Sequence, residues 1–205
     1  MTPSAPTTLD LLRIAQLSFA LGRVSRATFH EDGVTRESDT DHTVMLAAAA
    51  PALAALYPEL NADLVCAYAV VHDLGESITG DVNTLGISAA DAGAKRAKDR
   101  EAVGALCERF AGVPWLVARL REYEAQKAPE ARLVRVVDKL LPKLTHILNR
   151  GAALRGMSVD DLTDAHDAQF RALLEQYPEF SAIISGYLSP AMCAAEWVLL
   201  FGTST

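Results

Sequence analysis

The stretch VVHDLGESITGD, residues 70–81, decides how this sequence is interpreted. A histidine and an aspartate stand side by side after an apolar run, a glutamate follows three residues after the aspartate, and a second aspartate follows a Thr-Gly turn. On a helix, Glu76 lies four residues after His72 and three after Asp73, so these ionisable side chains would share one face. Burying the three groups without partners would cost roughly several kcal/mol. A bound divalent metal ion would offset that cost.

The rest of a metal site has to come from elsewhere in the chain, because one imidazole and one carboxylate do not hold a divalent transition metal firmly. His42 begins a predicted helix after a polar loop, and Asp138 is the one acidic residue in the apolar segment LVRVVDKLL. Pro142 cannot donate a hydrogen bond to the carbonyl of Asp138 and crowds it, so the helix should bend there. Taken singly, each histidine is typical of a packed or capping residue, and Asp138 of a salt bridge with Arg135. The joint pattern favours a metal site.

Composition and periodicity predict an all-α fold. Half of the residues are apolar, largely Ala, Leu and Val, while aromatic residues make up 6%, which suits packed helices better than a sheet. We expect residues 25–39 to form a loop and no segment to form a strand. Caps and helical spacing predict helices over residues 7–24, 61–76, 88–110, 114–126, 129–151, 158–177 and 179–201. Another helix should begin at residue 39 or 40, with Pro51 kinking or splitting it.

Length and charge limit the class of protein. The 205 residues suffice for one domain with one core, and no glycine-, serine- or proline-rich linker divides them, so we expect a single domain over residues 1–205. The net charge of -7 argues against binding to a nucleic-acid polymer or an anionic membrane, although a small anionic ligand could still bind a local basic pocket.

The sequence also carries a prediction of compartment. Its first ten residues lack the features of a signal peptide, and the longest apolar run, 44–57, is too short to span a bilayer, so we expect a soluble cytoplasmic protein. Cys66, Cys107 and Cys193 are an odd number with no CxxC spacing, which favours buried free thiols over disulfides or a zinc knuckle.

The combined motif resembles a known family. His42, the pair His72-Asp73, and Asp138 resemble the H…HD…D signature of the HD-domain metal-dependent phosphohydrolases. HDLGESITGD is similar to the HDxxExxxGD motif of the branch that contains bacterial 5'-deoxynucleotidases and the HD-domain-containing protein 2 group. The flanking segments RESDTDH and EYEAQKAPEARLVRVVDKL also resemble that branch. The resemblance covers about residues 20–145, does not extend to the C-terminal helices at about 158–201, and implies an HD-domain helical bundle.

The resemblance implies a ligand set and catalytic roles. One divalent ion, which could be manganese, cobalt, iron, nickel or zinc, would be held by His42, His72, Asp73 and Asp138. Glu76 would protonate the leaving sugar oxygen or orient the attacking water, and Asp81 would assist it.

Basic residues for the substrate phosphate follow from the same resemblance. Arg26 best matches the branch's phosphate-binding arginine, with Arg23 and Arg36 as competitors. Lys98 falls where the branch carries another basic residue. Arg135, three residues before the last predicted ligand, falls where the family usually has a basic residue. For each of these a solvated surface charge is the alternative.

The chain departs from that branch at one position. Its members, and related phage dATP triphosphohydrolases, carry a tryptophan just after the phosphate arginine, whereas this chain has Ala27, so base and sugar selection are open. His146 could edge the pocket, but we expect it to pack between helices, and we expect His166 to be solvated. Trp115 and Trp197 are interpreted as core or interface residues.

The leading hypothesis is hydrolysis of a (deoxy)nucleoside 5'-monophosphate to nucleoside and phosphate. A dNTP triphosphohydrolase that releases tripolyphosphate is the alternative. A (p)ppGpp hydrolase is disfavoured, because that group has HDxxED and here Ser77 follows Glu76. A non-catalytic nucleotide-binding HD module would not need Glu76 and Asp81. The apolar segment GYLSPAMCAAEWVLLF, residues 186–201, either covers the core or forms an interface, and family resemblance favours a homodimer.

Overall fold

The computed structural model describes residues 6–82 and 89–187 of the chain, and these fall into two compact units. The first unit comprises Met1–Arg26 and Ser38–Val134, and the second comprises Ala27–Glu37 and Arg135–Thr205. The prediction of one domain over residues 1–205 stays a prediction. No helix in the described part of the chain is long and apolar enough to cross a membrane.

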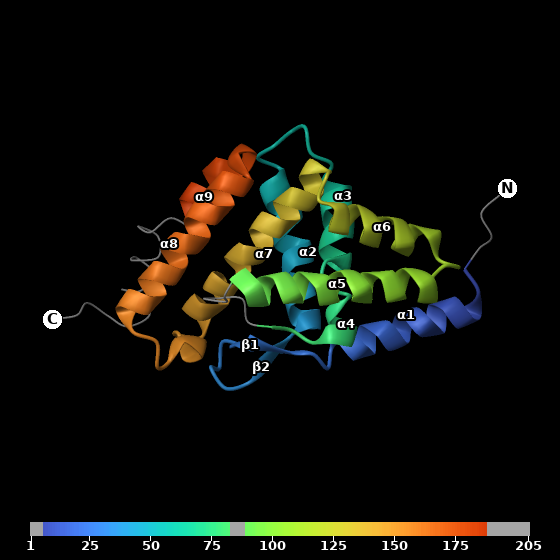
Figure 1. Cartoon of the computed structure of the whole chain (residues 1–205), viewed down its shortest axis with the longest axis horizontal. Helices are drawn as coiled ribbons and strands as arrows, with labels where there is room; N and C mark the ends of the chain where they lie inside the picture. The colour runs from blue at the N-terminus through green and yellow to red at the C-terminus, as the bar shows by residue number, and fades with distance from the viewer. Residues whose placement is uncertain (1–5, 83–88, 188–205) are drawn as a thin grey trace. The chain divides into compact units, whose positions relative to one another are not determined.

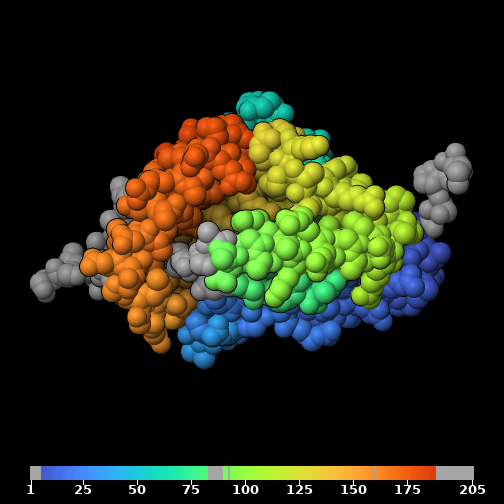
Figure 2. Space-filling model, in the orientation of Figure 1, coloured from blue at the N-terminus to red at the C-terminus, as the bar shows by residue number. Residues whose placement is uncertain are grey.

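The first unit is built from helices. They are α1 (Thr8–Leu21), α2 (Asp39–Ala54), α3 (Ala62–Val71), α4 (Glu76–Thr79), α5 (Ala89–Arg109) and α6 (Pro114–Ala125), and α7 (Pro129–Leu148) begins in this unit. Helix α2 packs along α3, α6 packs on both α3 and α5, and the short α4 packs on α1 and α5 (Figure 1). The surface view shows α5 and α6 side by side (Figure 2). Leu46, Val65, Tyr68, Leu106 and Phe110 are buried in the core of this unit.

The second unit contains the rest of α7 and the elements after it. These are the 3-10 helix η1 (Ala152–Leu154), α8 (Val159–Gln176), the 3-10 helix η2 (Pro178–Phe180) and α9 (Ser181–Tyr187). Helix α8 packs on η2 and α9, and Leu173, Tyr177, Phe180, Ile183 and Ile184 are buried in this unit. The all-α prediction is confirmed. Helix α9 lies within the predicted helix 179–201, whose residues after Tyr187 lie outside the described residues.

Side-chain caps explain where the helices begin. The Thr7 hydroxyl accepts a hydrogen bond from the backbone N–H of Asp10, and the Asp10 carboxylate accepts one from the N–H of Thr7. Ser38 and Asp41 form the same reciprocal capping box at α2. Asn61 caps α3 through its side-chain oxygen, as predicted.

The helix predicted over residues 61–76 is wrong in its length. Helix α3 ends at Val71, and His72 is its C-cap. A tight turn with hydrogen bonds between residues three apart follows, and in it the N–H of Glu76 donates to the carbonyl of Asp73 over 2.8 Å. Helix α4 then begins at Glu76. Gly75 is a poor helix former, which is consistent with a break at this point. Glu76 therefore comes near Asp73 through a tight turn and not through one continuous helix face.

The loop predicted over residues 25–39 is also wrong in part. Strands β1 (Ser25–Phe29) and β2 (Arg36–Ser38) pair in a two-stranded sheet. The turn between them is local: the Asp32 carboxylate accepts hydrogen bonds from the N–H groups of Val34 and Thr35, and Gly33 has a φ of +66°. Strands this short give no alternating pattern long enough to detect from sequence.

Several smaller predictions have clear outcomes. Pro51 does not split its helix, since α2 continues through it, and α7 continues through Pro142. The bends predicted at these prolines stay predictions. Cys66 is half-buried and Cys107 is buried, and both are free thiols. Trp115 is 55% exposed, so it is not a core residue. Cys193 and Trp197 lie outside the described residues.

Candidate metal centre

Three of the predicted ligands meet in the first unit. His42 lies in the first turns of α2 and is buried, His72 closes α3, and Asp73 follows in the tight turn. The ring centroids of the two histidines are 5.3 Å apart. One ligand atom from each of His42, His72 and Asp73 lies within 4.8 Å of the others. The capping box of α2 and the end of α3 thus bring two imidazoles and a carboxylate together.

The orientation of His72 fits a metal ligand. Its Nδ1 lies 2.8 Å from the carbonyl oxygen of Ala69, which can only accept, so Nδ1 carries the proton. The other ring nitrogen, Nε2, lies 2.8 Å from Oδ2 of Asp73. Two electron-pair donors at that distance need a proton or a cation near both. A backbone carbonyl that fixes the tautomer is also the usual support for a metal-binding histidine.

Asp73 is further held by Arg26. The Nη1 of Arg26 lies 2.9 Å from Oδ1 of Asp39 and 3.4 Å from Oδ2 of Asp73. Asp39 is fully buried at the start of α2, and its burial raises the pKa of its carboxyl although the Arg26 guanidinium opposes that shift. Arg26, the predicted phosphate-binding residue, therefore lies at the centre, where it contacts two carboxylates.

Glu76 is buried next to the same carboxylates. Its Oε1 accepts a hydrogen bond from Nζ of Lys95 over 3.0 Å, and Lys95 also reaches Oδ2 of Asp99 over 3.1 Å. Burial, and then the charge of Asp73, raise the pKa of Glu76 to about 9. Burial lowers the pKa of Lys95, but a charged Glu76, together with the Asp99 carboxylate, would outweigh burial and raise it. Glu76 is therefore suited to hold a proton, beside a permanent cation.

Lys95 is the basic residue of α5 that contacts Glu76, whereas Lys98, the predicted substrate-binding residue, is exposed on the same helix. One signal for Lys95 exists in the sequence: Asp99 stands four residues later and can pair with it on a helix face. That spacing alone does not predict that Lys95 also contacts Glu76 in α4.

A second acidic group is present in the first unit. Oxygen atoms of Asp39, Asp73 and Glu76 also lie within 4.8 Å of one another. Arg26 pairs with the first two and Lys95 with the third. Because imidazole nitrogens suit a transition metal better than carboxylates alone, the group that contains the two imidazoles is the better candidate.

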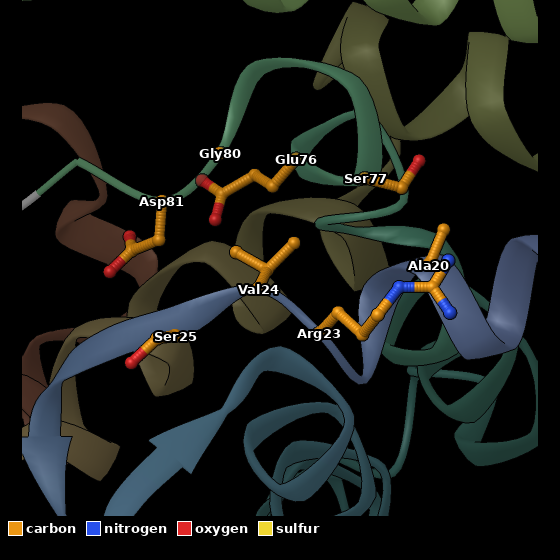
Figure 3. A pocket seen from close by; sticks show the side chains of 8 residues that line it. All are labelled: Ala20, Arg23, Val24, Ser25, Glu76, Ser77, Gly80 and Asp81. Carbon is orange, nitrogen blue, oxygen red and sulfur yellow. The ribbon is translucent and has the colours of Figure 1, made fainter.

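A cavity of about 460 Å³ opens beside Glu76. Figure 3 shows the carboxylates of Glu76 and Asp81 directed to the same side of it, above Val24 and Ser25, while the Arg23 guanidinium points toward the opposite end. Its lining residues come from the end of α1, the start of β1, α4 and the segment after α4: Ala20, Arg23, Val24, Ser25, Glu76, Ser77, Gly80 and Asp81. The two predicted catalytic carboxylates therefore share one cavity with Arg23.

The remaining predicted residues lie in the second unit. Asp138 is buried on α7, where its Oδ2 lies 2.9 Å from Nζ of Lys139, and Arg135 is half-buried on the same helix. The Arg36 guanidinium lies over the ring of Phe29, 4.8 Å from its centroid. The role of Asp138 as the fourth ligand stays a prediction.

The prediction that His166 is solvated is wrong. His166 on α8 is buried, and its Nδ1 accepts a hydrogen bond of 3.4 Å from the buried Lys143 on α7. Burial, and then the charge of Lys143, lower the pKa of His166 to about 4. Burial likewise lowers the pKa of His146 to about 4, in keeping with a helix-packing residue. Because the neighbours of His166 in the sequence are acidic, the sequence does not indicate that this face of α8 is buried.

Comparisons with known proteins bear on the family and on the fold. A family model described as HD domain matches residues 20–179, which extends beyond the resemblance recognised in the motifs. A solved structure from Magnetospirillum magnetotacticum, described as a "Predicted metal-dependent phosphohydrolase", is 20% identical with a TM-score of 0.69, and the match covers 92% of this chain and 96% of that chain. A conserved hypothetical protein from Pyrococcus furiosus is 22% identical with a TM-score of 0.58, over 86% and 98% of the two chains. A search of the curated proteins found no match. The family match and the shared fold confirm the predicted helical bundle.

Proposed function

We propose, because this chain belongs to the HD-domain family, that it is a metal-dependent phosphohydrolase acting on a small nucleotide, and more narrowly on a (deoxy)nucleoside 5'-monophosphate. The observation that carries the proposal is the meeting of His42, His72 and Asp73 next to the buried Glu76. Two imidazoles and a carboxylate suit a divalent transition metal, and a buried carboxyl with a raised pKa suits a proton donor.

We assign four ligands to one divalent ion: His42, His72, Asp73 and Asp138. When bound, such an ion lowers the pKa of a water molecule and withdraws charge from the phosphorus. The protein residues orient these ligands. The Ala69 carbonyl fixes the tautomer of His72, and Arg26 fixes the carboxylate of Asp73.

Glu76 is the proposed proton donor. Burial and the neighbouring Asp73 raise its pKa, which favours the protonated form that can give a proton to the leaving sugar oxygen. Asp81 lines the same cavity and would accept a hydrogen bond from the sugar or from water next to that oxygen. A hydrogen-bonding cavity of this kind suits a leaving group that carries hydroxyl groups.

The phosphate needs cations. Nη1 of Arg26 contacts Asp39 and Asp73, so this guanidinium lies beside the proposed ligands, and its planar fork of N–H donors is the kind of group that binds phosphate oxygens. Arg23 lines the cavity beside Glu76. Lys98 and Arg135 remain the other proposed substrate-binding residues.

The decisive experiment is a substrate panel. The purified protein, with manganese or cobalt, is incubated with each mono- and triphosphate, and both products are identified. Nucleoside and orthophosphate from monophosphates would support the proposal. Nucleoside and tripolyphosphate from a dNTP, with monophosphates untouched, would establish the triphosphohydrolase alternative. Stoichiometric metal without hydrolysis of any nucleotide would favour a non-catalytic binding module.

A further inference from the structure

We propose that Lys95 is a positioning residue that holds the Glu76 carboxylate by one oxygen, and that Asp99 anchors Lys95 for this purpose. The inference rests on the proposed function of Glu76 as a proton donor. It concerns a residue of α5 that the sequence motif does not contain.

The geometry forms a chain of contacts from α5 to α4. The Nζ of Lys95 lies 3.0 Å from Oε1 of Glu76 and 3.1 Å from Oδ2 of Asp99. Lys95 and Asp99 lie one turn apart on α5, so Asp99 fixes the lysine relative to its own helix. Helix α4 packs on α5, which brings Glu76 to the other side of the ammonium group.

The two oxygens of Glu76 have different surroundings. Lys95 holds Oε1, whereas Oε2 is buried and has no hydrogen-bond partner among the residues that the structure describes. A buried carboxyl oxygen without a partner is costly, and it persists where a ligand or water supplies the missing bond. We therefore assign Oε2 as the oxygen that carries the proton for the leaving group.

Helix α4 cannot fix this side chain alone. It has four residues, it follows a tight turn, and it ends at Gly80 with a φ of 75°. Arg26 pairs instead with Asp39 and Asp73, and the Arg23 guanidinium points toward the opposite end of the cavity (Figure 3). Lys95 thus supplies the contact that selects one position of the Glu76 carboxylate, and a small displacement of a proton donor lowers the rate steeply.

The experiment compares variants of the full-length protein. Lys95→Met removes the charge at similar length, Asp99→Asn weakens the anchor, and Lys95→Arg restores the charge. Arg100→Met, an exposed cation on the same helix, is the matched control. We expect kcat to fall about 10- to 100-fold in Lys95→Met with KM changed less than about 3-fold and metal content kept. Asp99→Asn should show a smaller loss, and Lys95→Arg should recover part of the rate.

A double-mutant cycle separates positioning from plain stabilisation. If Lys95 acts through Glu76, Lys95→Met should have no further effect on kcat in a Glu76→Gln background. An equal loss in both backgrounds, or loss of metal from Lys95→Met, would overturn the proposal.

A structural measurement keeps the inference independent of the proposed function. Crystal structures of the wild type and of Lys95→Met would show whether the Glu76 carboxylate moves. An unmoved carboxylate contradicts the role of Lys95 even if the enzyme is active. If the wild type hydrolyses no phosphoester, the proposed function fails, while a displaced Glu76 in Lys95→Met still supports the contact as the one that orients it.

Discussion

Asp73 is the residue on which the metal centre depends, because its carboxylate contacts both the His72 imidazole and the Arg26 guanidinium. Its Oδ2 lies 2.8 Å from Nε2 of His72 and 3.4 Å from Nη1 of Arg26. Arg26 is itself fixed by the buried Asp39. Arg26 therefore holds the carboxylate of Asp73 beside His72, as residues that support metal ligands do.

The first prediction concerns the ligands. Asp73→Ala and His72→Ala should each lose bound metal and activity, because deleting one of four ligands leaves the others unable to hold the geometry. Elemental analysis of the purified variants, together with circular dichroism to verify folding, measures this. Stoichiometric metal in folded Asp73→Ala would contradict the ligand assignment.

Glu76 should behave differently from the ligands. We expect Glu76→Gln to keep metal and substrate while kcat falls by about 10²- to 10⁴-fold, the usual contribution of a placed acid or base. Metal analysis and steady-state kinetics on the same preparation test this. Loss of metal would make Glu76 a ligand, and near-normal turnover would exclude both roles.

Among the elements, α7 and α8 carry a buried basic cluster in the second unit. Lys143 donates to Nδ1 of His166, which therefore has its proton on Nε2 and is neutral. Glu37 acts on His146 in the opposite direction, since its charge raises the pKa of that histidine while burial lowers it more. Both histidines are thus held neutral inside the fold.

This cluster makes stability depend on pH. The folded-state pKa of each histidine, about 4, lies below the ordinary value of 6.5, so the unfolded chain binds more protons between those values. The free energy of unfolding should fall as pH drops from about 6.5 to about 4, by on the order of 1–3 kcal/mol per histidine. Urea denaturation of wild type, His146→Gln and His166→Gln across this range measures it. An unchanged slope in both variants would rule out this origin.

Local signals explain which elements the sequence predicts. Thr7 and Asn61 cap helices through hydrogen bonds three residues away, so the starts of α1 and α3 can be predicted from short segments. The break after Val71 cannot be predicted in this way, because His72 and Gly75 keep helical backbone angles and the break shows in the hydrogen-bond spacing. The sheet β1-β2 escapes prediction for a similar reason, since its turn chemistry at Asp32 joins strands too short to show a period.

Part of the candidate site can likewise be predicted from the sequence, and part cannot. The spacing of His72, Asp73 and Glu76 places them near one another under either backbone, helix or turn. Lys95 lies nineteen residues from Glu76, and its contact depends on the packing of α4 on α5, which no periodicity encodes. The same holds for the pairing of Arg26 with Asp39 and Asp73, thirteen and forty-seven residues away.

On the scale of the whole molecule, we propose that the protein is a homodimer. Residues 186–201 are strongly apolar in sequence, and most of them lie outside the described residues. In the first unit, Leu9, Leu12 and Phe19 of α1 are each more than half exposed and lie at helical spacing on one side. Apolar surface of this kind commonly marks an interface. Multi-angle light scattering should give twice the mass of one chain, and a monomer at all concentrations would contradict the proposal.

The last prediction is that residues 1–205 unfold as one domain. The boundary between the units falls inside regular elements: α7 continues from Val134 to Arg135, and β1 continues from Arg26 to Ala27. Opening either unit would disrupt hydrogen bonds of an element that begins or ends in the other, which favours a cooperative transition. Pulsed hydrogen exchange with mass spectrometry, at increasing urea, can follow peptides from α3 and from α8 separately. Coincident midpoints are expected, whereas midpoints that differ beyond error would mean that the two units are independent domains.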